Sequence, residues 1–183
     1  MKSFRYLILF IILSFVSFVF LGWYSGIFAR TKVEIKAVGP YVVAYADFKG
    51  EYSETAQIQD SLYNKLWEDG VENYQAFGIF YDDPQNTPVE NLRSKVGCVI
   101  HKDYISKIYK MTNKYRVLTI EKQTCAVVEL PYNNSFSVYA GIYKAYPALH
   151  DYCKENGYPV NPIIEIYDVP HNILFIMPLT AKK

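Results

Sequence analysis

The sequence predicts an α+β protein, in which an N-terminal transmembrane helix precedes a duplicated strand-strand-helix-strand-strand domain with pseudo-two-fold symmetry. Three observations lead to this fold class. An uncharged apolar run extends from Tyr6 to Ala29. Two later segments show the spacing of amphipathic helices, and β-type segments lie before and after each. The strand-like stretch Pro162-Ile-Ile-Glu-Ile-Tyr-Asp-Val-Pro170 also has an earlier counterpart in Gly78-Ile-Phe-Tyr-Asp-Asp-Pro84.

The apolar run is long enough to cross a bilayer. As a helix, residues 6–29 would span ~36 Å, which exceeds the hydrocarbon thickness of a membrane. A secretory signal peptide is the alternative, because Lys2 and Arg5 resemble its charged first region, but no clean Ala-x-Ala cleavage site follows. We therefore expect residues 1–30 to be an uncleaved anchor, with Trp23 and Tyr24 at the membrane interface.

The three cysteines, Cys98, Cys125 and Cys153, form no CxxC motif and no even-numbered framework. This usage favours a reducing compartment, so we expect a single-pass membrane protein with a cytosolic body. His101 and His150 each lie three residues from a cysteine, as in some zinc sites. On the predicted strand that odd separation sends Cys98 and His101 to opposite faces, and we expect no metal and no cofactor.

Composition narrows the class of partner. The chain has 19 basic and 18 acidic residues, and its body contains no block of Lys and Arg, so the basic footprint of a nucleic-acid-binding protein is missing. With 18 Tyr and 11 Phe the chain is rich in aromatic residues. Tyr suits both pocket walls and half-buried packing, and composition leaves both readings open.

The first unit is expected over about residues 33–101, within a body of residues 31–183. A helix follows Ser53, with Ile58, Leu62 and Leu66 as its buried stripe and Trp67 beside them. The strands are expected at 33–38, 41–48, 76–81 and 95–101, and the first two are expected to pair as a hairpin around Gly39-Pro40. Asp82-Asp83-Pro84 is interpreted as a turn, because Asp side chains before Pro bond nearby backbone amides.

The second unit is expected over about residues 115–179 and repeats the same order. Its helix spans 135–155, and Pro147 within it predicts a kink or a late helix start. The buried stripe of that helix comprises Val138, Ile142, Ala145 and Leu149. Its strands are expected at 115–120, 124–130, 163–168 and 173–177.

Glu165 is the candidate functional residue. Period-two alternation puts it on one face of a strand with Ile163 and Tyr167, while Ile164 and Ile166 occupy the other face. A carboxylate in such an apolar strand must reach solvent, find a partner or stay protonated. In the earlier counterpart strand, Ile79 stands where Glu165 stands, so one unit carries a charge that the other lacks. A solvated or Lys-paired carboxylate at a sheet edge is the simpler alternative.

Several short sequence motifs of this chain occur together in one known family. Val42-Val-Ala-Tyr45, Gly50-Glu-Tyr-Ser-Glu-Thr55, Tyr81-Asp-Asp-Pro84 and Ile164-Glu-Ile-Tyr167 appear in the order typical of the GyrI-like small-molecule-binding (effector-binding) domain, whose repeats are of the SHS2 type. The whole chain resembles the branch of the membrane-anchored testis-expressed ER-phagy receptor, which has an N-terminal span and a Leu130-Pro-Tyr132-like turn.

The resemblance implies a membrane-anchored small-molecule-binding module with an aromatic ligand groove between the two units. It implies that Glu165 faces this groove and attracts a cationic or aromatic ligand, and that Tyr81 and Tyr167 are strand tyrosines of the site. Helical position adds Tyr139, Tyr143 and Trp67 as candidate ligand-binding residues.

Two alternatives stay open beside the binding module. Some members of the family resemble hydrolases of strained electrophilic molecules, in which a pocket Glu and Tyr act together. We expect no enzyme here, because the sequence holds no Ser/His/Asp order, no nucleophilic Cys with a base and no phosphate loop. The third reading is a membrane scaffold or ER-phagy-receptor-like adaptor. In that branch a disordered tail engages autophagosome membrane proteins, and we expect this chain to lack it, since Lys183 follows closely on the last strand.

Overall fold

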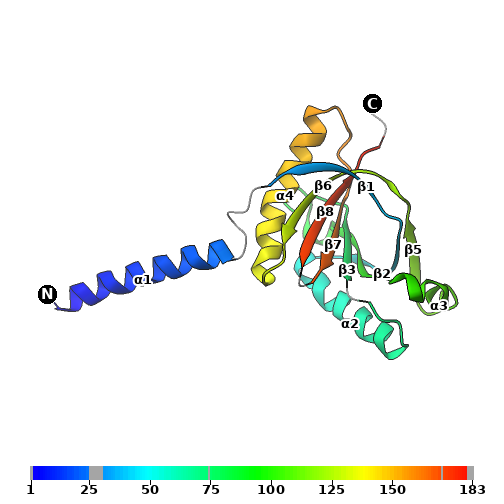
Figure 1. Ribbon diagram of the computed structural model, residues 1–183, viewed down its shortest axis with the longest axis horizontal. Helices are drawn as coiled ribbons and strands as arrows, with labels where there is room; N and C mark the ends of the chain where they lie inside the picture. Colours follow the sequence, from blue (N-terminus) through cyan, green and yellow to red (C-terminus); the bar gives the residue numbers. More distant parts are fainter. Residues whose placement is uncertain (1, 25–30, 74, 170, 181–183) are drawn as a thin grey trace.

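The computed structural model describes residues 2–24, 31–73, 75–169 and 171–180. Its body is an α+β domain built on one eight-stranded sheet in which all neighbouring strands are antiparallel. One helix, α1, extends away from this body, as Figure 1 shows. The predicted fold class, with an apolar N-terminal helix followed by strands and two longer helices, is confirmed.

The bounds of the elements are close to those expected from the sequence. The helices are α1 (Lys2–Tyr24), α2 (Thr55–Glu68), α3 (Ile105–Tyr109) and α4 (Ser135–Glu155), and short 3-10 turns occupy Tyr52–Glu54, Val89–Asn91 and Lys102–Tyr104. The strands are β1 (Val33–Val38), β2 (Tyr41–Lys49), β3 (Gln75–Phe80), β4 (Arg93–Val99), β5 (Arg116–Ile120), β6 (Gln123–Pro131), β7 (Ile163–Asp168) and β8 (Asn172–Pro178).

The strand order is β1-β6-β8-β7-β3-β4-β2-β5. β1 and β2 are therefore not neighbours, and the hairpin expected around Gly39-Pro40 is wrong. β1 pairs with β6, with Val33 opposite Val128, while β2 lies between β4 and β5. When β1, β2, β3 and β4 are matched to β5, β6, β7 and β8, matched strands lie at equal distances from the two edges of the sheet. The duplication of the two units itself stays a prediction.

One face of the sheet encloses a core made by strands alone. Its buried members come from β2 to β8, and the sheet curls around them (Figure 1). Ile164 and Ile166 of β7 belong to this cluster, as do Phe77 and Ile79 of β3. Burial of each such side chain contributes roughly 1.5–3 kcal/mol, so this layer is a main source of stability.

The other face carries the helices. Cys98, Ala76 and Tyr167 are successive register partners across β4, β3 and β7, so they point to the same side of the sheet. Cys98 packs in a cluster with α2 and α3, and Tyr167 packs against the cluster that includes α4. The two longer helices therefore cover the two halves of one face, and β3 and β7 run between them at the centre.

An N-cap residue, Asn134, defines the start of α4. The Asn134 side chain accepts a 2.9 Å hydrogen bond from the Phe136 amide, and Ser137 Oγ completes a capping box. The helix continues through Pro147 to Glu155, so the expected late start is wrong. Pro147 is exposed, and so is Tyr143, whose carbonyl loses its helical partner because Pro147 has no amide hydrogen.

Candidate functional site

Glu165 lies at the centre of the helix-covered face. Its strand alternates as predicted, because Ile164 and Ile166 join the strand core while Ile163 and Tyr167 pack toward α4. Glu165 is 1% exposed and is the one charged side chain among the largest fully buried residues described. The edge-strand alternative is therefore wrong, since β7 is a central strand paired on both sides.

Two phenol groups hold the buried carboxylate. The Tyr146 hydroxyl donates to Glu165 Oε1 at 2.6 Å, and the Tyr167 hydroxyl donates a short hydrogen bond to Oε2. Burial raises the pKa of Glu165, and the two hydroxyl donors act in the opposite direction. Burial also raises the pKa of both phenols, and the nearby carboxylate adds to this effect. The trio thus contains one ionisable acid and two neutral donors.

No basic side chain pairs with Glu165 in the part of the chain that the structure describes. Among the described residues, its hydrogen-bond partners are the two hydroxyl groups. A buried carboxylate without a cation is costly, because hydroxyl donors replace only part of the lost hydration. Protonation of Glu165 or a positive charge placed beside it would lower this cost.

A cavity of about 190 Å³ lies directly beside this trio. Tyr146 forms part of its wall, and Ile163 contributes from the same strand as Glu165. The carboxylate itself is not in the wall and lies behind the Tyr146 hydroxyl. The lining residues come from the β3 end, α4 and the segment before β7: Phe80, Tyr81, Asp82, Asp83, Pro84, Tyr146, His150, Val160, Asn161, Pro162 and Ile163.

Gly78 stands opposite Glu165 in the β3–β7 ladder. A Cβ built on Gly78 would lie 2.7 Å from Phe80 Cε2, so the Phe80 ring covers the space that Gly78 leaves. Ile79 points into the strand core on the other face. The expectation that Ile79 stands where Glu165 stands is therefore wrong, because the two side chains face opposite sides of the sheet.

The rim of the cavity is fixed by hydrogen bonds around the end of β3. The Tyr52 hydroxyl donates to the Arg93 carbonyl at 3.0 Å and accepts from the Asp82 amide at 3.1 Å. The Asp83 carboxylate accepts from the Gln85 amide at 2.9 Å, as predicted for a turn. These bonds hold the Asp82-Asp83-Pro84 turn at the cavity mouth.

Two basic groups lie near this rim. Asp82 pairs with Arg93 at 2.7 Å, and the bonds from Arg93 lower the Asp82 pKa. His150 belongs to the cavity wall, where burial and then the charge of Lys154 lower its pKa. A histidine held toward its neutral form leaves the cavity without a fixed positive charge of its own.

The structure brings together some of the predicted site residues and separates others. Tyr167 bonds Glu165, and Tyr81 lies at the cavity rim with 37% of its surface exposed. Tyr139 and Tyr143 are 68% and 83% exposed on α4 and do not line the cavity. Trp67 is 51% exposed on α2, where it stacks on Tyr63 with 6.3 Å between ring centroids.

Sequence reasoning missed two residues of the site, Tyr146 and Phe80. Tyr146 follows Ile142 by four residues and precedes Leu149 by three, so it lies on the flank of the predicted buried stripe. That position is a signal that it turns inward. Phe80 carries no comparable signal, because its place beside Glu165 depends on the pairing of β3 with β7.

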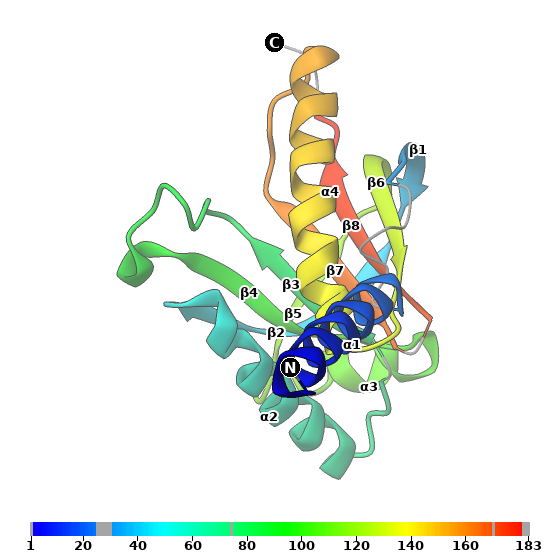
Figure 2. The same cartoon turned by 90° about the vertical axis from the view of Figure 1, so that its left-hand side faces the viewer.

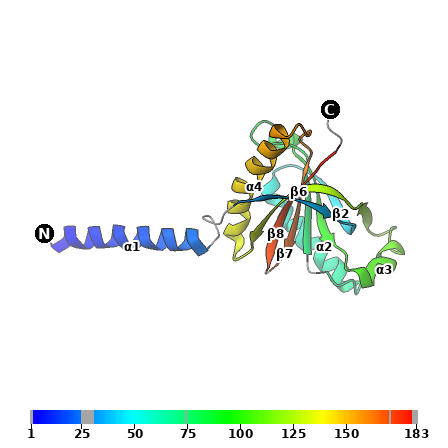
Figure 3. The same cartoon turned by 45° about the horizontal axis from the view of Figure 1, so that its top comes forward.

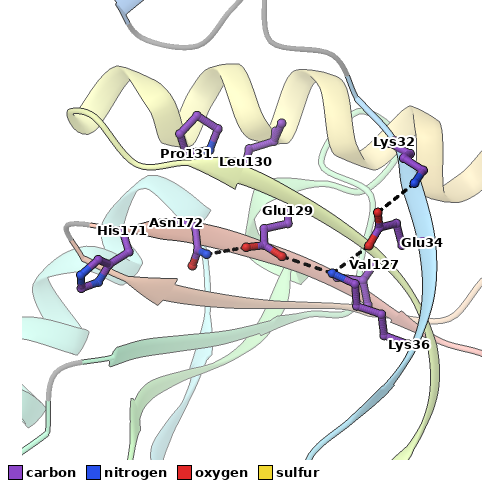
Figure 4. A pocket seen from close by; sticks show the side chains of 9 residues that line it. All are labelled: Lys32, Glu34, Lys36, Val127, Glu129, Leu130, Pro131, His171 and Asn172. Atoms are coloured by element: carbon purple, nitrogen blue, oxygen red, sulfur yellow. Dashed lines mark hydrogen bonds and ion pairs between the residues drawn. The ribbon is translucent and has the colours of Figure 1, made fainter.

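A larger hollow of about 430 Å³ lies along β1, β6 and β8 (Figure 4). Its charges neutralise one another. Lys36 pairs with Glu34 at 2.9 Å and with Glu129 at 3.3 Å, and Asn172 donates to Glu129 at 2.6 Å. Exposed pairs of this kind contribute little free energy, and no uncompensated charge is buried there. The cavity beside Glu165 is the better candidate site.

Comparison with known protein families assigns this chain to one of them. The family model described as the GyrI-like small molecule binding domain matches residues 31–173. This chain belongs to the GyrI-like family. The match covers β1 to β7 and the first two residues of β8, together with the cavity and Glu165.

The relatives of this GyrI-like chain include one animal protein and several solved structures. The testis-expressed protein 264 homolog of Mus musculus is 26% identical over 172 residues, which cover 87% of this chain and 52% of that protein. The chain thus spans about half the length of this curated relative. The structure of SAV2435 bound to tetraphenylphosphonium is 13% identical, with a TM-score of 0.57, and covers 82% of this chain and 94% of its own. The EcmrR C-terminal domain is 16% identical, with a TM-score of 0.60, and covers 84% and 99%.

Proposed function

We propose that this chain is a membrane-anchored protein whose GyrI-like domain binds an aromatic cation, with Glu165 as the countercharge. The family supplies the general class, a small-molecule-binding domain. The observation that carries the specific proposal is the buried carboxylate that lacks a basic partner among the described residues and lies behind the wall of a cavity. A ligand cation supplies the charge that the fold omits.

Ligand entry requires the wall to move. The cavity of about 190 Å³ is smaller than most small-molecule sites. Two of its lining side chains lie next to Glu165: the Phe80 ring covers Gly78, which is opposite Glu165, and the Tyr146 hydroxyl bonds Oε1. Rotation of these two side chains opens the cavity toward the carboxylate. Binding is therefore coupled to the loss of the Tyr146 hydrogen bond.

The energy of binding comes from charge and aromatic contact. The walls offer aromatic faces from Phe80, Tyr81 and Tyr146. A cation over such a face contributes about 0.5–2 kcal/mol, with the upper value in desolvated sites. The Glu165 carboxylate adds an attraction that is strong because the site excludes water. A neutral ligand of the same shape receives the apolar contact alone.

The membrane part of the proposal rests on α1. Its segment Phe4–Tyr24 is long and apolar enough to span a bilayer, and none of it is buried against the body. At 1.5 Å per residue it is ~31 Å long, close to the hydrocarbon thickness. Trp23 and Tyr24 at its end suit the interface. Retention of the uncut chain in carbonate-washed membranes supports the anchor, and recovery of a shortened, soluble chain indicates a signal sequence instead.

Tetraphenylphosphonium is the probe of choice, because SAV2435, a structural neighbour, was solved with it bound. The fragment of residues 31–183 holds the family domain and avoids partition of this lipophilic cation into detergent. A domain of similar fold, the EcmrR C-terminal domain, was solved as a separate chain. Calorimetric titration of the fragment is expected to show saturable binding. Incubation with a cyclopropane-containing electrophile tests the hydrolase alternative, and recovery of that compound unchanged counts against it.

Glu165→Gln is the decisive variant, since it keeps the shape of the side chain and removes its charge. We expect tetraphenylphosphonium to bind at least tenfold more weakly, and neutral triphenylphosphine oxide to bind both proteins alike. Glu129→Gln is the matched control, because Glu129 lies in the exposed charged hollow of Figure 4. Equal affinity of the wild type and Glu165→Gln for the cation would refute the proposal.

A further inference from the structure

A row of aromatic side chains is left uncovered on the first half of α4. Phe136, Tyr139 and Tyr143 are 70%, 68% and 83% exposed. Their spacing of three and four residues puts them on one stripe of the helix, opposite the side that packs on the sheet through Ala145 and Leu149. Large exposed aromatic groups gathered in this way mark an interaction surface.

The character of the stripe changes along the helix. In its first half the exposed positions from Ser135 to Pro147 carry no charge. In its second half the exposed positions become Asp151, Lys154 and Glu155. The aromatic half is the one that starts beside the apolar helix α1, because the Asn133 side chain donates a 2.7 Å hydrogen bond to the Tyr24 carbonyl.

The arrangement of the helices shows which side of the molecule this stripe faces. Figure 1 and Figure 3 both show α4 as the helix of the body next to the end of α1. Figure 2, which looks along α1 toward the body, shows α4 lying across the view in front of the sheet. The buried side of α4 faces the sheet, so its exposed stripe faces the side from which α1 extends.

We propose that the stripe formed by Phe136, Tyr139 and Tyr143 rests on the lipid surface that α1 enters. The inference rests on the membrane anchoring proposed above. With α1 across the bilayer, α4 lies roughly in the plane of the membrane, and its aromatic half occupies the interfacial zone that Tyr and Phe favour. From Phe136 to Tyr143 the contact runs for ~11 Å along the helix. The contact fixes the orientation of the domain and keeps the far half of α4, with its charges, in water.

Nitroxide labels on the full chain in phosphatidylcholine vesicles test this contact. Oxygen concentrates in lipid and a nickel chelate stays in water, so the ratio of their effects on a spin label reports its surroundings. Labels would be placed through Tyr143→Cys on the stripe, Asp151→Cys on the charged half and Leu13→Cys inside α1. The native cysteines are at most 2% exposed. Background labelling of these cysteines is measured with the wild-type chain.

The inference predicts lipid surroundings for the labels at 13 and 143 and water for the label at 151. Lipid at 13 with water at 143 overturns the surface contact and leaves the anchor intact. Water at 13 overturns the anchor and the inference together. A label at 143 shielded from both reagents indicates a protein partner or a second copy and also overturns the inference. As a second arm, Phe136→Asp with Tyr139→Asp is expected to abolish the lipid contact at 143, and Asp151→Asn to leave it unchanged.

Discussion

The Tyr146 hydroxyl on α4 lies 2.6 Å from Glu165 Oε1 on β7, so a single hydrogen bond joins the helix layer to the buried charge of the central strands. Tyr146 also forms part of the cavity wall. A ligand that reaches Glu165 must take the place of this hydroxyl. Occupancy of the cavity, the charge of Glu165 and the packing of α4 are therefore linked.

Removal of the charge is expected to stabilise the unliganded protein at neutral pH. Burial raises the folded-state pKa of Glu165 above 4.5, so the folded protein holds this proton more tightly than the unfolded chain. Stability is then lost as pH rises from about 4.5 through the folded pKa. Glu165→Gln avoids this loss, and we expect this variant to be more stable than the wild type at neutral pH, with a difference that disappears near pH 4.5. Denaturant unfolding at several pH values measures it, and a loss of several kcal/mol at pH 7 contradicts it.

Cation affinity is expected to fall as the pH is lowered. The cation binds the ionised form of Glu165, so a proton competes with it. Because burial raises this pKa, competition begins closer to neutrality than for an ordinary glutamate. Below that pKa, affinity falls by up to about tenfold per pH unit until it reaches the affinity of Glu165→Gln. Titrations of the wild-type fragment with tetraphenylphosphonium between pH 5 and 8 check this, and a flat profile that matches Glu165→Gln contradicts it.

Loss of one phenol donor is expected to destabilise the fold. Tyr146→Phe leaves Glu165 with Tyr167 as its one hydroxyl partner among the described residues. A lost bond to a buried charged group costs about 1–3 kcal/mol. Tyr143→Phe, on the same helix but 83% exposed, is the matched control and should change stability by less than about 0.5 kcal/mol. Equal unfolding midpoints for the two variants would show that the Tyr146 bond contributes nothing.

A methyl group at Gly78 is expected to weaken cation binding. Its Cβ would meet the Phe80 ring at 2.7 Å, and this ring can move because it is the end of a flexible side chain. Gly78→Ala should therefore fold with a cost of about 1 kcal/mol while filling the space next to Glu165. Gly70→Ala is the control, since the φ of +67° at Gly70 disfavours a side chain and Gly70 lies outside the cavity wall. It should lose stability without a matching loss of affinity, and unchanged affinity in Gly78→Ala contradicts the proposed route.

Helices and strands that are defined by nearby residues, such as caps, prolines and alternating apolar positions, were predicted well from the sequence. α4 begins at the Asn134 cap and ends before Asn156, and Gly157 follows in the left-handed conformation with a φ of +71°. β7 occupies the predicted residues 163–168, because alternation and flanking prolines define it. The sequence singled out Glu165 as an unusual charge in an apolar strand but left its burial open, and the structure shows that it is 1% exposed.

Features that depend on distant pairing were not predictable from the sequence. No local pattern says that β1 leaves β2 and joins β6. The comparison of Ile79 with Glu165 failed for the same reason, since a shift of one residue exchanges the faces of a strand. Helical position predicts Tyr139 and Tyr143 as site residues, yet the α4 tyrosine that bonds Glu165 is Tyr146.

A crystal structure of the fragment of residues 31–183 with bound tetraphenylphosphonium tests the central claim most directly. The account predicts the cation against the Glu165 carboxylate, with the Phe80 ring turned away from Gly78 and the Tyr146 hydroxyl displaced from Oε1. Density for the cation elsewhere, with both tyrosine bonds to Glu165 intact, would contradict it.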